Sequence, residues 1–245
     1  MLRETFLSLT VTESPLEVAE RTASMLEEQC AEALRQRKVF NLAVSGGKTP
    51  VPLFQLLSSP AWRRRIDWEK TVLYWVDERC VGPDHPDSNY RVVREELLAH
   101  VPITRFYRMK GEEEPVRAAE AYERLLLDNF ALPPGEIPCF DCILLGVGDD
   151  GHVGSLFPHS CVLNEKQRLV ADQYIHHLKS SRITMTFPLL NSSRCCIVMA
   201  VGKEKHHVLS TALNLMEEPA LPAQMLRPTS GRLCWIIDEA AYTGR

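Results

Sequence analysis

The sequence of 245 residues lacks several features that would place it in a specialised class of protein. No apolar run approaches 18 residues, the length that would predict a membrane-spanning helix. An excess of basic residues is also absent, because 28 Lys and Arg stand against 32 Asp and Glu and give a net charge of −4. Nucleic-acid-binding proteins usually carry a basic surface, so we expect neither a membrane nor a nucleic acid as partner.

Cysteines are too few for a disulfide scaffold, with eight in the whole chain. Cys139 and Cys142 form a CxxC pair in a segment that resembles a buried strand, and no second such pair exists to complete a zinc site. The first 15 residues, MLRETFLSLTVTESP, include Glu4 and Glu13 and no small-residue cleavage site, so we expect no signal peptide. These absences predict reduced thiols, no bound metal and a cytoplasmic location.

The sequence does show an alternation of hydrophobic patterns, in which segments typical of helices alternate with segments typical of strands. Ser14, Pro15 and Glu17 form a helix-start signature in which Ser14 is the N-cap and Glu17 completes a capping box. Predicted helices cover residues 15–37, a segment from residue 50, and residues 88–100, 112–130 and 203–215. Predicted strands cover residues 6–11, 39–44, 71–76, 103–109, 140–147, 182–187, 194–201 and 232–237.

Strands that alternate with helices of this length are typical of a parallel sheet covered on both faces. No repeat or linker divides the chain, so residues 1–245 are expected to form a single α/β domain with a mostly parallel β-sheet. Ligands in such folds bind at the carboxyl ends of the strands. Three of those ends carry unusual residues.

The first is SGGKTP, residues 45–50, which follows the strand VFNLAV. It contains the Gly-Lys-Thr of a P-loop, but Leu42 stands where a P-loop requires its first glycine. The shorter loop favours a seat for a single phosphate, in which Gly46 and Gly47 expose backbone N–H groups and Thr49 caps the following helix. An ordinary strand-to-helix turn is the structural alternative.

The second strand end carries Asp77, Glu78 and Arg79 directly after TVLYWV. Three charges at the end of a buried strand are unusual on packing grounds, and an arginine there can bind an oxyanion with its planar fork of donors. A structural ion pair at the edge of the sheet is the alternative.

The third is LLGVGDDGHVGSLFP, residues 144–158, which formally matches GxGxxG. Two aspartates would face a pyrophosphate and Pro158 leaves too short a helix, so dinucleotide binding is disfavoured. Instead the glycines bend the chain so that Asp150 and His152 face one cleft, where a carboxylate raises the basicity of an imidazole, as a general base requires.

This segment gives little indication of a nucleophilic serine or of a metal site. Ser155 lacks the nucleophile elbow and the second histidine that would activate it. His152, His159 and Cys161 match no familiar metal-ligand spacing.

These segments together resemble the 6-phosphogluconolactonase family. The resemblance is carried by SGGKTP, DER, DHPDSNYRVVREELL, LLGVGDDGHVGSLFP, SRITMTFPLLN, GKEKHHVL and LCWIIDEAA, in the family's order over nearly the whole chain. It implies a fold like that of glucosamine-6-phosphate deaminases. It also implies hydrolysis of 6-phosphogluconolactone to 6-phosphogluconate, in the pentose phosphate pathway, without metal or organic cofactor.

The resemblance implies a role for each matching residue. His152 is the base that deprotonates water, Asp150 orients it, and Arg79 stabilises the charge that develops on the lactone oxygen. The residues implied to hold the 6-phosphate are Ser45, Gly46, Gly47, Lys48, Thr49, Arg182 and Lys205. Two positions depart from the family, which commonly has Ser at position 48 and Thr at position 153, where this chain has Lys48 and Val153.

Two rival functions remain. A sugar-phosphate isomerase or deaminase on the same fold resembles the chain in its loop motif, but those deaminases carry a glutamate five residues after the loop histidine, where this chain has Phe157. A non-catalytic sugar-phosphate sensor would keep the phosphate seat but has no need of His152 and Arg79.

Overall fold

The computed structural model describes residues 6–214 and 221–245. Its main element is a seven-stranded sheet of order β1-β10-β9-β6-β2-β3-β5, in which every neighbouring pair is parallel. The strands of this sheet are β1 (Phe6–Thr12), β2 (Phe40–Val44), β3 (Thr71–Trp75), β5 (Arg105–Tyr107), β6 (Cys142–Gly146), β9 (Cys195–Ala200) and β10 (Arg232–Asp238). The expected α/β fold with a mostly parallel sheet is confirmed.

The helices are assigned as follows. They are α1 (Pro15–Arg37), α2 (Val51–Ser58), α3 (Asn89–Val93), α4 (Pro115–Phe130), α5 (Phe187–Leu190), α6 (His206–Ala212) and α7 (Glu239–Thr243). A π-helical turn, η2 (Arg94–Leu98), continues α3. The predicted start of α1 is confirmed, because the Ser14 side chain accepts a hydrogen bond from the backbone N–H of Glu17.

Helices lie on both faces of the sheet, as two adjacent residues of β3 demonstrate. Side chains of neighbouring strand residues point to opposite faces. The Tyr74 ring packs on Phe130 of α4, with centroids 5.9 Å apart, whereas the Trp75 ring packs on Tyr90 of α3 at 5.5 Å. Every residue of β3 is buried, which explains why this strand is a continuous apolar run.

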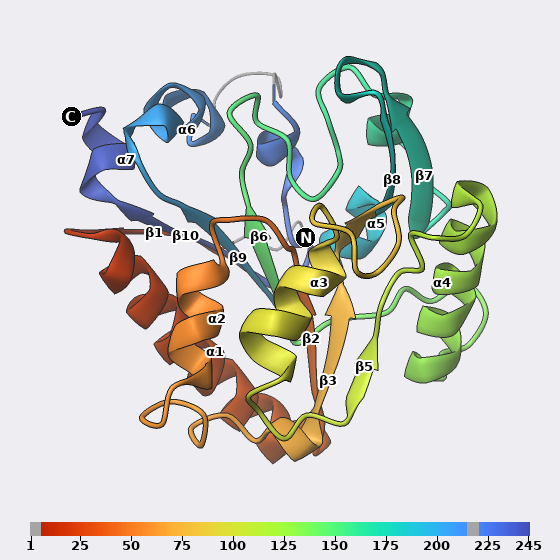
Figure 1. The fold of residues 1–245 in the computed structure, drawn as a ribbon, viewed down its shortest axis with the longest axis horizontal. Helices are drawn as coiled ribbons and strands as arrows, with labels where there is room; N and C mark the ends of the chain where they lie inside the picture. Colours follow the sequence, from red (N-terminus) through yellow and green to blue (C-terminus); the bar gives the residue numbers. More distant parts are fainter. Residues whose placement is uncertain (1–5, 215–220) are drawn as a thin grey trace.

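The sequence-based prediction was wrong about one strand and missed two. Residues 182–187 were expected to join the parallel sheet, but they fall largely in β8 (Ser180–Met185) of a separate sheet. That sheet has the order β4-β8-β7, is antiparallel, and includes the unpredicted strands β4 (Asp77–Arg79) and β7 (Val170–Ile175). It lies beside α4 at the right of Figure 1. Strand β4 escaped prediction because its three charged residues carry no apolar pattern.

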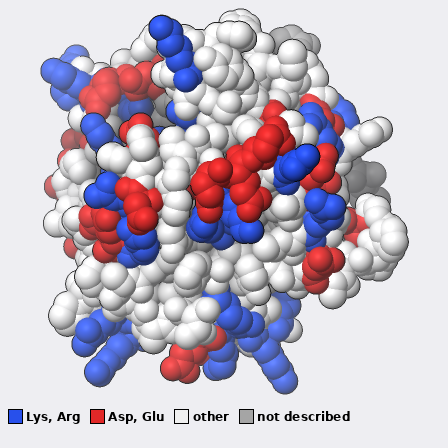
Figure 2. All heavy atoms as spheres, turned by 45° about the vertical axis from the view of Figure 1, so that its right-hand side comes forward, with Lys and Arg blue, Asp and Glu red and all other residues white. Residues whose placement is uncertain are grey.

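The surface shows no dominance of one charge on the face in Figure 2. Basic and acidic side chains are interspersed across the middle of this face, in keeping with the near balance of the composition. Within residues 6–214 and 221–245, no helix is both long and apolar enough to cross a membrane.

Candidate active site

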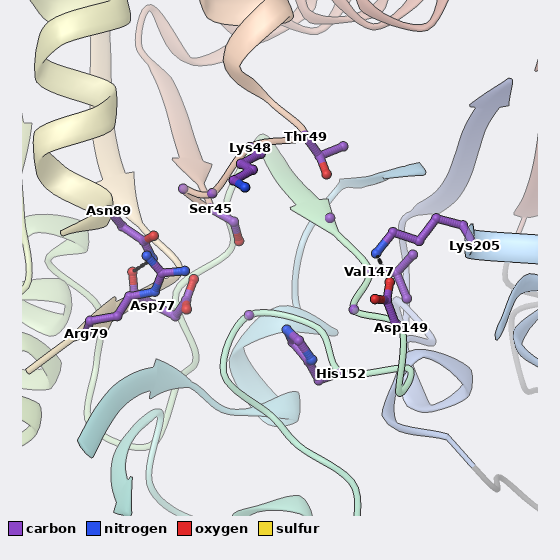
Figure 3. A pocket seen from close by; sticks show the side chains of 15 residues that line it. Ser45, Lys48, Thr49, Asp77, Arg79, Asn89, Val147, Asp149, His152 and Lys205 are labelled. Atoms are coloured by element: carbon purple, nitrogen blue, oxygen red, sulfur yellow. Dashed lines mark hydrogen bonds and ion pairs between the residues drawn. The ribbon is translucent and has the colours of Figure 1, made fainter. Parts of the chain in front are cut away.

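A cavity of about 280 Å³ opens at the carboxyl ends of four neighbouring strands, β9, β6, β2 and β3. This is the edge of a parallel sheet at which ligands are expected. Figure 3 shows the loops after these strands facing one another around the space. The residues that line it are Ser45, Gly46, Gly47, Lys48, Thr49, Asp77, Arg79, Asn89, Gly146, Val147, Gly148, Asp149, His152, Gly154 and Lys205.

The loop after β2 forms one wall of this cavity with all five residues from Ser45 to Thr49. Gly46 is required by close packing, because a Cβ there would lie 2.3 Å from Oδ1 of Asn89. The expectation that Thr49 caps the next helix was wrong. Helix α2 begins at Val51 with Pro50 at the cap position and no side-chain cap, so the Thr49 hydroxyl is not engaged in capping.

The three charged residues of β4 have different surroundings. Asp77 is buried and its Oδ2 accepts a hydrogen bond of 2.7 Å from the Ser155 hydroxyl. Arg79 is partly exposed, and its Nη1 donates to the backbone oxygen of Asp87. Both residues line the cavity (Figure 3), so the prediction that this strand end contributes to a site is consistent with their placement.

Glu78, by contrast, anchors the start of α3 and does not line the cavity. Its carboxylate accepts hydrogen bonds from the backbone N–H groups of Arg79, Asn89 and Tyr90 and from the Ser88 hydroxyl, at 2.7–3.1 Å. Burial raises the pKa of Glu78, although the backbone hydrogen bonds oppose this effect. The carboxylate therefore fixes the helix that carries Asn89.

The loop after β6 brings His152 and Asp150 together. Nδ1 of His152 lies 2.6 Å from Oδ1 of Asp150, which also accepts from the His152 backbone N–H at 3.1 Å. Because an ionised carboxylate only accepts hydrogen bonds, Nδ1 carries the proton and Nε2 of the neutral ring keeps its lone pair. Burial acts to raise the pKa of Asp150, but the hydrogen bonds and charge of His152 outweigh it and the net shift is downward.

Two residues pack against the His152 ring. The ring stacks on Phe157, with ring centroids 4.2 Å apart. It also lies close to Gly148, where a Cβ would come within 2.1 Å of Cε1 and Nδ1 of the ring. A side chain at position 148 would displace the imidazole, so this glycine is needed for the observed position of His152.

Lys205 forms the wall opposite Arg79 in Figure 3. It ends the short helix η5 (Lys203–Lys205) after β9, and its ammonium group pairs with the carboxylate of Asp149. The structure thus brings Lys205 to the cavity, as the resemblance implies.

Arg182 is not among the residues that line the cavity. It lies opposite Arg79 in the β4–β8 pair, and its guanidinium donates to the Ser180 hydroxyl and the Ser181 backbone oxygen. Burial and, after it, the charge of Arg79 lower the pKa of Arg182. Arg182 is therefore a second positive charge beside Arg79 and outside the lining of the cavity.

Three polar residues that line the cavity were not among the predicted site residues: Asp77, Asn89 and Asp149. Asn89 and Ser45 each have a buried polar atom, Oδ1 and Oγ, that finds no hydrogen-bond partner within residues 6–214 and 221–245. Such unsatisfied atoms are rare in proteins and here they belong to a cavity wall, which favours a polar ligand. The segment DSNY contained the signal for Asn89, because Ser88 caps a helix whose first residue is Asn89.

The weaker candidates receive no support from the geometry. Ser155 is buried and bonded to Asp77, so its hydroxyl is not held by a histidine. In the part of the chain that the structure describes, no three His, Cys, Asp or Glu side chains are grouped to hold a metal ion. Val153, at the position where the family commonly has Thr, is completely buried in the core.

Comparison with known proteins agrees with this arrangement. A 6-phosphogluconolactonase of Synechocystis sp. is 36% identical over 226 residues, which cover 91% of each chain. One of Nostoc sp. is 33% identical over 225 residues, which cover 90% of this chain and 91% of that one. The solved structure of 6-phosphogluconolactonase from Trypanosoma brucei superposes with a TM-score of 0.84 at 26% identity, covering 99% of this chain and 98% of that one.

A family model described as glucosamine-6-phosphate isomerases/6-phosphogluconolactonase matches residues 13–235. This match includes every loop that lines the cavity and both sheets, except for β1 and the last three residues of β10. The chain therefore belongs to the glucosamine-6-phosphate isomerase/6-phosphogluconolactonase family.

Proposed function

We propose that this protein hydrolyses 6-phospho-D-glucono-1,5-lactone to 6-phosphogluconate, with His152 as the general base. The observation that carries the proposal is the hydrogen bond of 2.6 Å between Asp150 and Nδ1 of His152, in a loop that lines a cavity also bounded by Arg79 and Lys205. An imidazole held through Nδ1 presents Nε2 to a water molecule, which is the geometry that base catalysis requires.

The reaction follows from these groups. Nε2 of His152 takes a proton from water as the water oxygen attacks the lactone carbonyl carbon. The negative charge that forms on the carbonyl oxygen is stabilised by Arg79. When the tetrahedral intermediate collapses, the bond from this carbon to the ring oxygen breaks, and the protonated imidazole returns its proton to the ring oxygen. The products are the carboxylic acid and a free hydroxyl, and the base is regenerated.

Asp150 has a positioning role in this scheme. Its carboxylate fixes the tautomer and orientation of His152 and stabilises the imidazolium that forms during the attack. It accepts two hydrogen bonds from His152 and has no reason to take up a proton itself.

The 6-phosphate is assigned to the wall formed by the loop Ser45–Thr49 and Lys205. Gly46 and Gly47 expose backbone N–H groups, Thr49 offers a hydroxyl, and Lys48 and Lys205 supply positive charge. Arg182, outside the lining, contributes its charge from beside Arg79, its partner in the β4–β8 pair. Because the phosphate is remote from the reacting carbon, its binding energy serves to position the ring.

Polar atoms without hydrogen-bond partners favour binding of the substrate's sugar ring, with its hydroxyl groups, in the part of the cavity not assigned to the phosphate. Oγ of Ser45 and Oδ1 of Asn89 are buried and have no hydrogen-bond partner among the described residues, so a small shift of either side chain towards the cavity would let it bond a sugar hydroxyl group. The Asn89 amide nitrogen is already bound to the backbone oxygen of Asp77 at 2.9 Å, so Oδ1 is left as an acceptor.

The rival deaminase reaction is disfavoured by the surroundings of His152. The position five residues after it is Phe157, whose ring stacks on the imidazole and offers no carboxylate to move a proton. A non-catalytic sugar-phosphate sensor would need the phosphate seat, but it would have no use for a histidine oriented by Asp150.

The deciding experiment is a lactonase assay on freshly generated 6-phosphogluconolactone, with the spontaneous rate subtracted. His152→Ala should lower kcat by about 10²–10⁴-fold, the usual contribution of general base catalysis. The matched control is His207→Ala, which removes an exposed histidine on α6 and should keep wild-type turnover. Wild-type kcat in His152→Ala would exclude the assigned base, and no activity in the wild type would exclude the function.

We also propose that the protein works in the cytoplasm without metal or organic cofactor and without a nucleic-acid partner. All eight cysteines are free thiols, which suits a reducing compartment. Activity should survive treatment with a chelator, and inhibition by it would contradict the cofactor-free scheme.

A further inference from the structure

The ion pair between Lys205 and Asp149 stands at a boundary between two cavities. Both residues line the site already described, and both also line an adjoining cavity of about 490 Å³ that reaches towards α1 and β9. Figure 3 shows the ammonium group of Lys205 turned towards the Asp149 carboxylate at the edge of the candidate active site.

The two partners differ sharply in exposure. The Lys205 side chain is 15% exposed, whereas that of Asp149 is 74% exposed. A charge that is mostly removed from water needs a counter-ion, so Lys205 depends on its partner. Asp149 remains hydrated with or without Lys205, and an ion pair with such an exposed member contributes little to stability. The carboxylate can therefore leave the ammonium group at low cost.

An entering phosphate competes for the same ammonium group. Lys205 lines the same cavity as residues 45–49, where the 6-phosphate is assigned. A phosphate monoester has a charge of about −2 near neutral pH and three strong acceptor oxygens, against one charge for a carboxylate. If both anions stayed at Lys205, they would repel each other across a short distance.

We propose that Asp149 is a resident counter-ion of Lys205 that the substrate's phosphate displaces. A dianion brings more charge than the carboxylate it replaces, whereas a monoanion does not. Asp149 thus determines how tightly the site holds a phosphate dianion and leaves the hydrolytic step to His152 and Arg79. The inference rests on the proposed function for the identity of the substrate, but the phosphate seat is testable without turnover.

Asp149→Asn should raise affinity for phosphate dianions and leave the chemistry unchanged. Removal of one nearby negative charge is expected to lower the Kd of 6-phosphogluconate and of inorganic phosphate by about three- to ten-fold. KM for the phosphorylated lactone should fall by a similar factor, with kcat within about two-fold of wild type. Hydrolysis of glucono-1,5-lactone, which has no phosphate, should not respond.

The matched control is Glu204→Gln. Glu204 precedes Lys205 in η5 and lines the adjoining cavity, but it does not line the candidate active site. This variant removes the same charge from the neighbourhood without freeing Lys205, so it should change the Kd of phosphate by less than two-fold. Asp149→Ala provides a second test of Asp149 with a different side chain and should change affinity in the same direction as Asp149→Asn.

Isothermal titration calorimetry with inorganic phosphate and 6-phosphogluconate, beside steady-state kinetics, separates the outcomes. Unchanged or weaker phosphate binding in both Asp149 variants, with Tm retained, would mean that Asp149 only positions Lys205 and would overturn the proposal. An equal gain in phosphate affinity in Glu204→Gln would mean that any lost negative charge nearby has this effect, and it would also overturn the proposal. If the wild type binds phosphate but does not hydrolyse the lactone, the proposed function is wrong. The titrations of the Asp149 variants then still test whether phosphate displaces Asp149 from Lys205.

Discussion

Replacement of Asp150 by Asn is the most informative test of the proposed mechanism, because it changes few atoms in a defined contact. In the structure, Oδ1 of Asp150 accepts from Nδ1 of His152 at 2.6 Å and from its backbone N–H at 3.1 Å. An asparagine keeps the shape but loses the charge, and its amide group can donate to Nδ1. The ring is then free to carry its proton on Nε2, where it cannot act as a base.

The size of the effect follows from the bond that is lost. Hydrogen bonds to charged groups contribute about 1.5–3 kcal/mol. If all of this hydrogen-bond free energy stabilises the transition state, in which the imidazole gains a proton, its loss should lower kcat by about 10- to 150-fold. The conversion uses about 1.4 kcal/mol for each factor of ten. KM should change little, because Asp150 does not line the cavity that receives the substrate.

The assay is the pH dependence of kcat on freshly generated lactone, with the spontaneous rate subtracted at each pH. In Asp150→Asn, kcat should be lower than in wild type throughout the measured range, since the Nδ1 proton of His152 loses its carboxylate acceptor. Asp128→Asn, which removes an exposed carboxylate on α4, is the control and should leave the profile unchanged. A variant with wild-type kcat throughout this range would refute the role of Asp150.

Asp150 also links stability to pH, with a sign that can be checked on the same variant. Its pKa is lowered in the folded protein, so its contribution to stability is present above the pKa of the unfolded chain and is lost as pH falls through the folded value. The denaturation midpoint of Asp150→Asn should therefore be lower than that of wild type at neutral pH and converge with it in strong acid. A constant difference at all pH values would contradict the assigned interaction.

Three further predictions test the supports of the site. Gly148→Ala should lower kcat strongly with little loss of Tm, because the added methyl group would occupy the position of the His152 ring; wild-type kcat would show that the ring adapts. Tyr122→Phe should destabilise the protein by about 1–3 kcal/mol, or about 2–4 °C in Tm for each kcal/mol, because it leaves the buried N–H of Trp75 without its acceptor; an unchanged melting curve would refute this. Arg79→Ala should lower kcat by about 10²–10³-fold while the Kd of inorganic phosphate changes less, and the reverse pattern would assign Arg79 to phosphate binding.

Interactions between residues close in the sequence were sufficient to predict the main strands and helix α1. The apolar runs of β2, β3, β6, β9 and β10 and the Ser14 cap of α1 follow from hydrophobic period and capping, which act between near neighbours. Because the carboxyl ends of parallel strands share one edge of the sheet, the predicted strands also indicate that the loop 45–49, Arg79 and His152 lie close together.

Contacts between distant segments decided what the sequence alone left open. Asp77, Glu78 and Arg79 are consecutive, but their surroundings differ. Asp77 bonds Ser155 and lines the cavity with Arg79, whereas Glu78 anchors α3. These contacts depend on the pairing of β4 with a strand about 100 residues away in the sequence. Arg182 lies opposite Arg79 in this strand pair and outside the lining of the cavity. Asn89 entered the wall because Glu78 fixes its helix. Residue type and spacing determine which chemistry is available, and long-range packing determines which side chain faces the substrate.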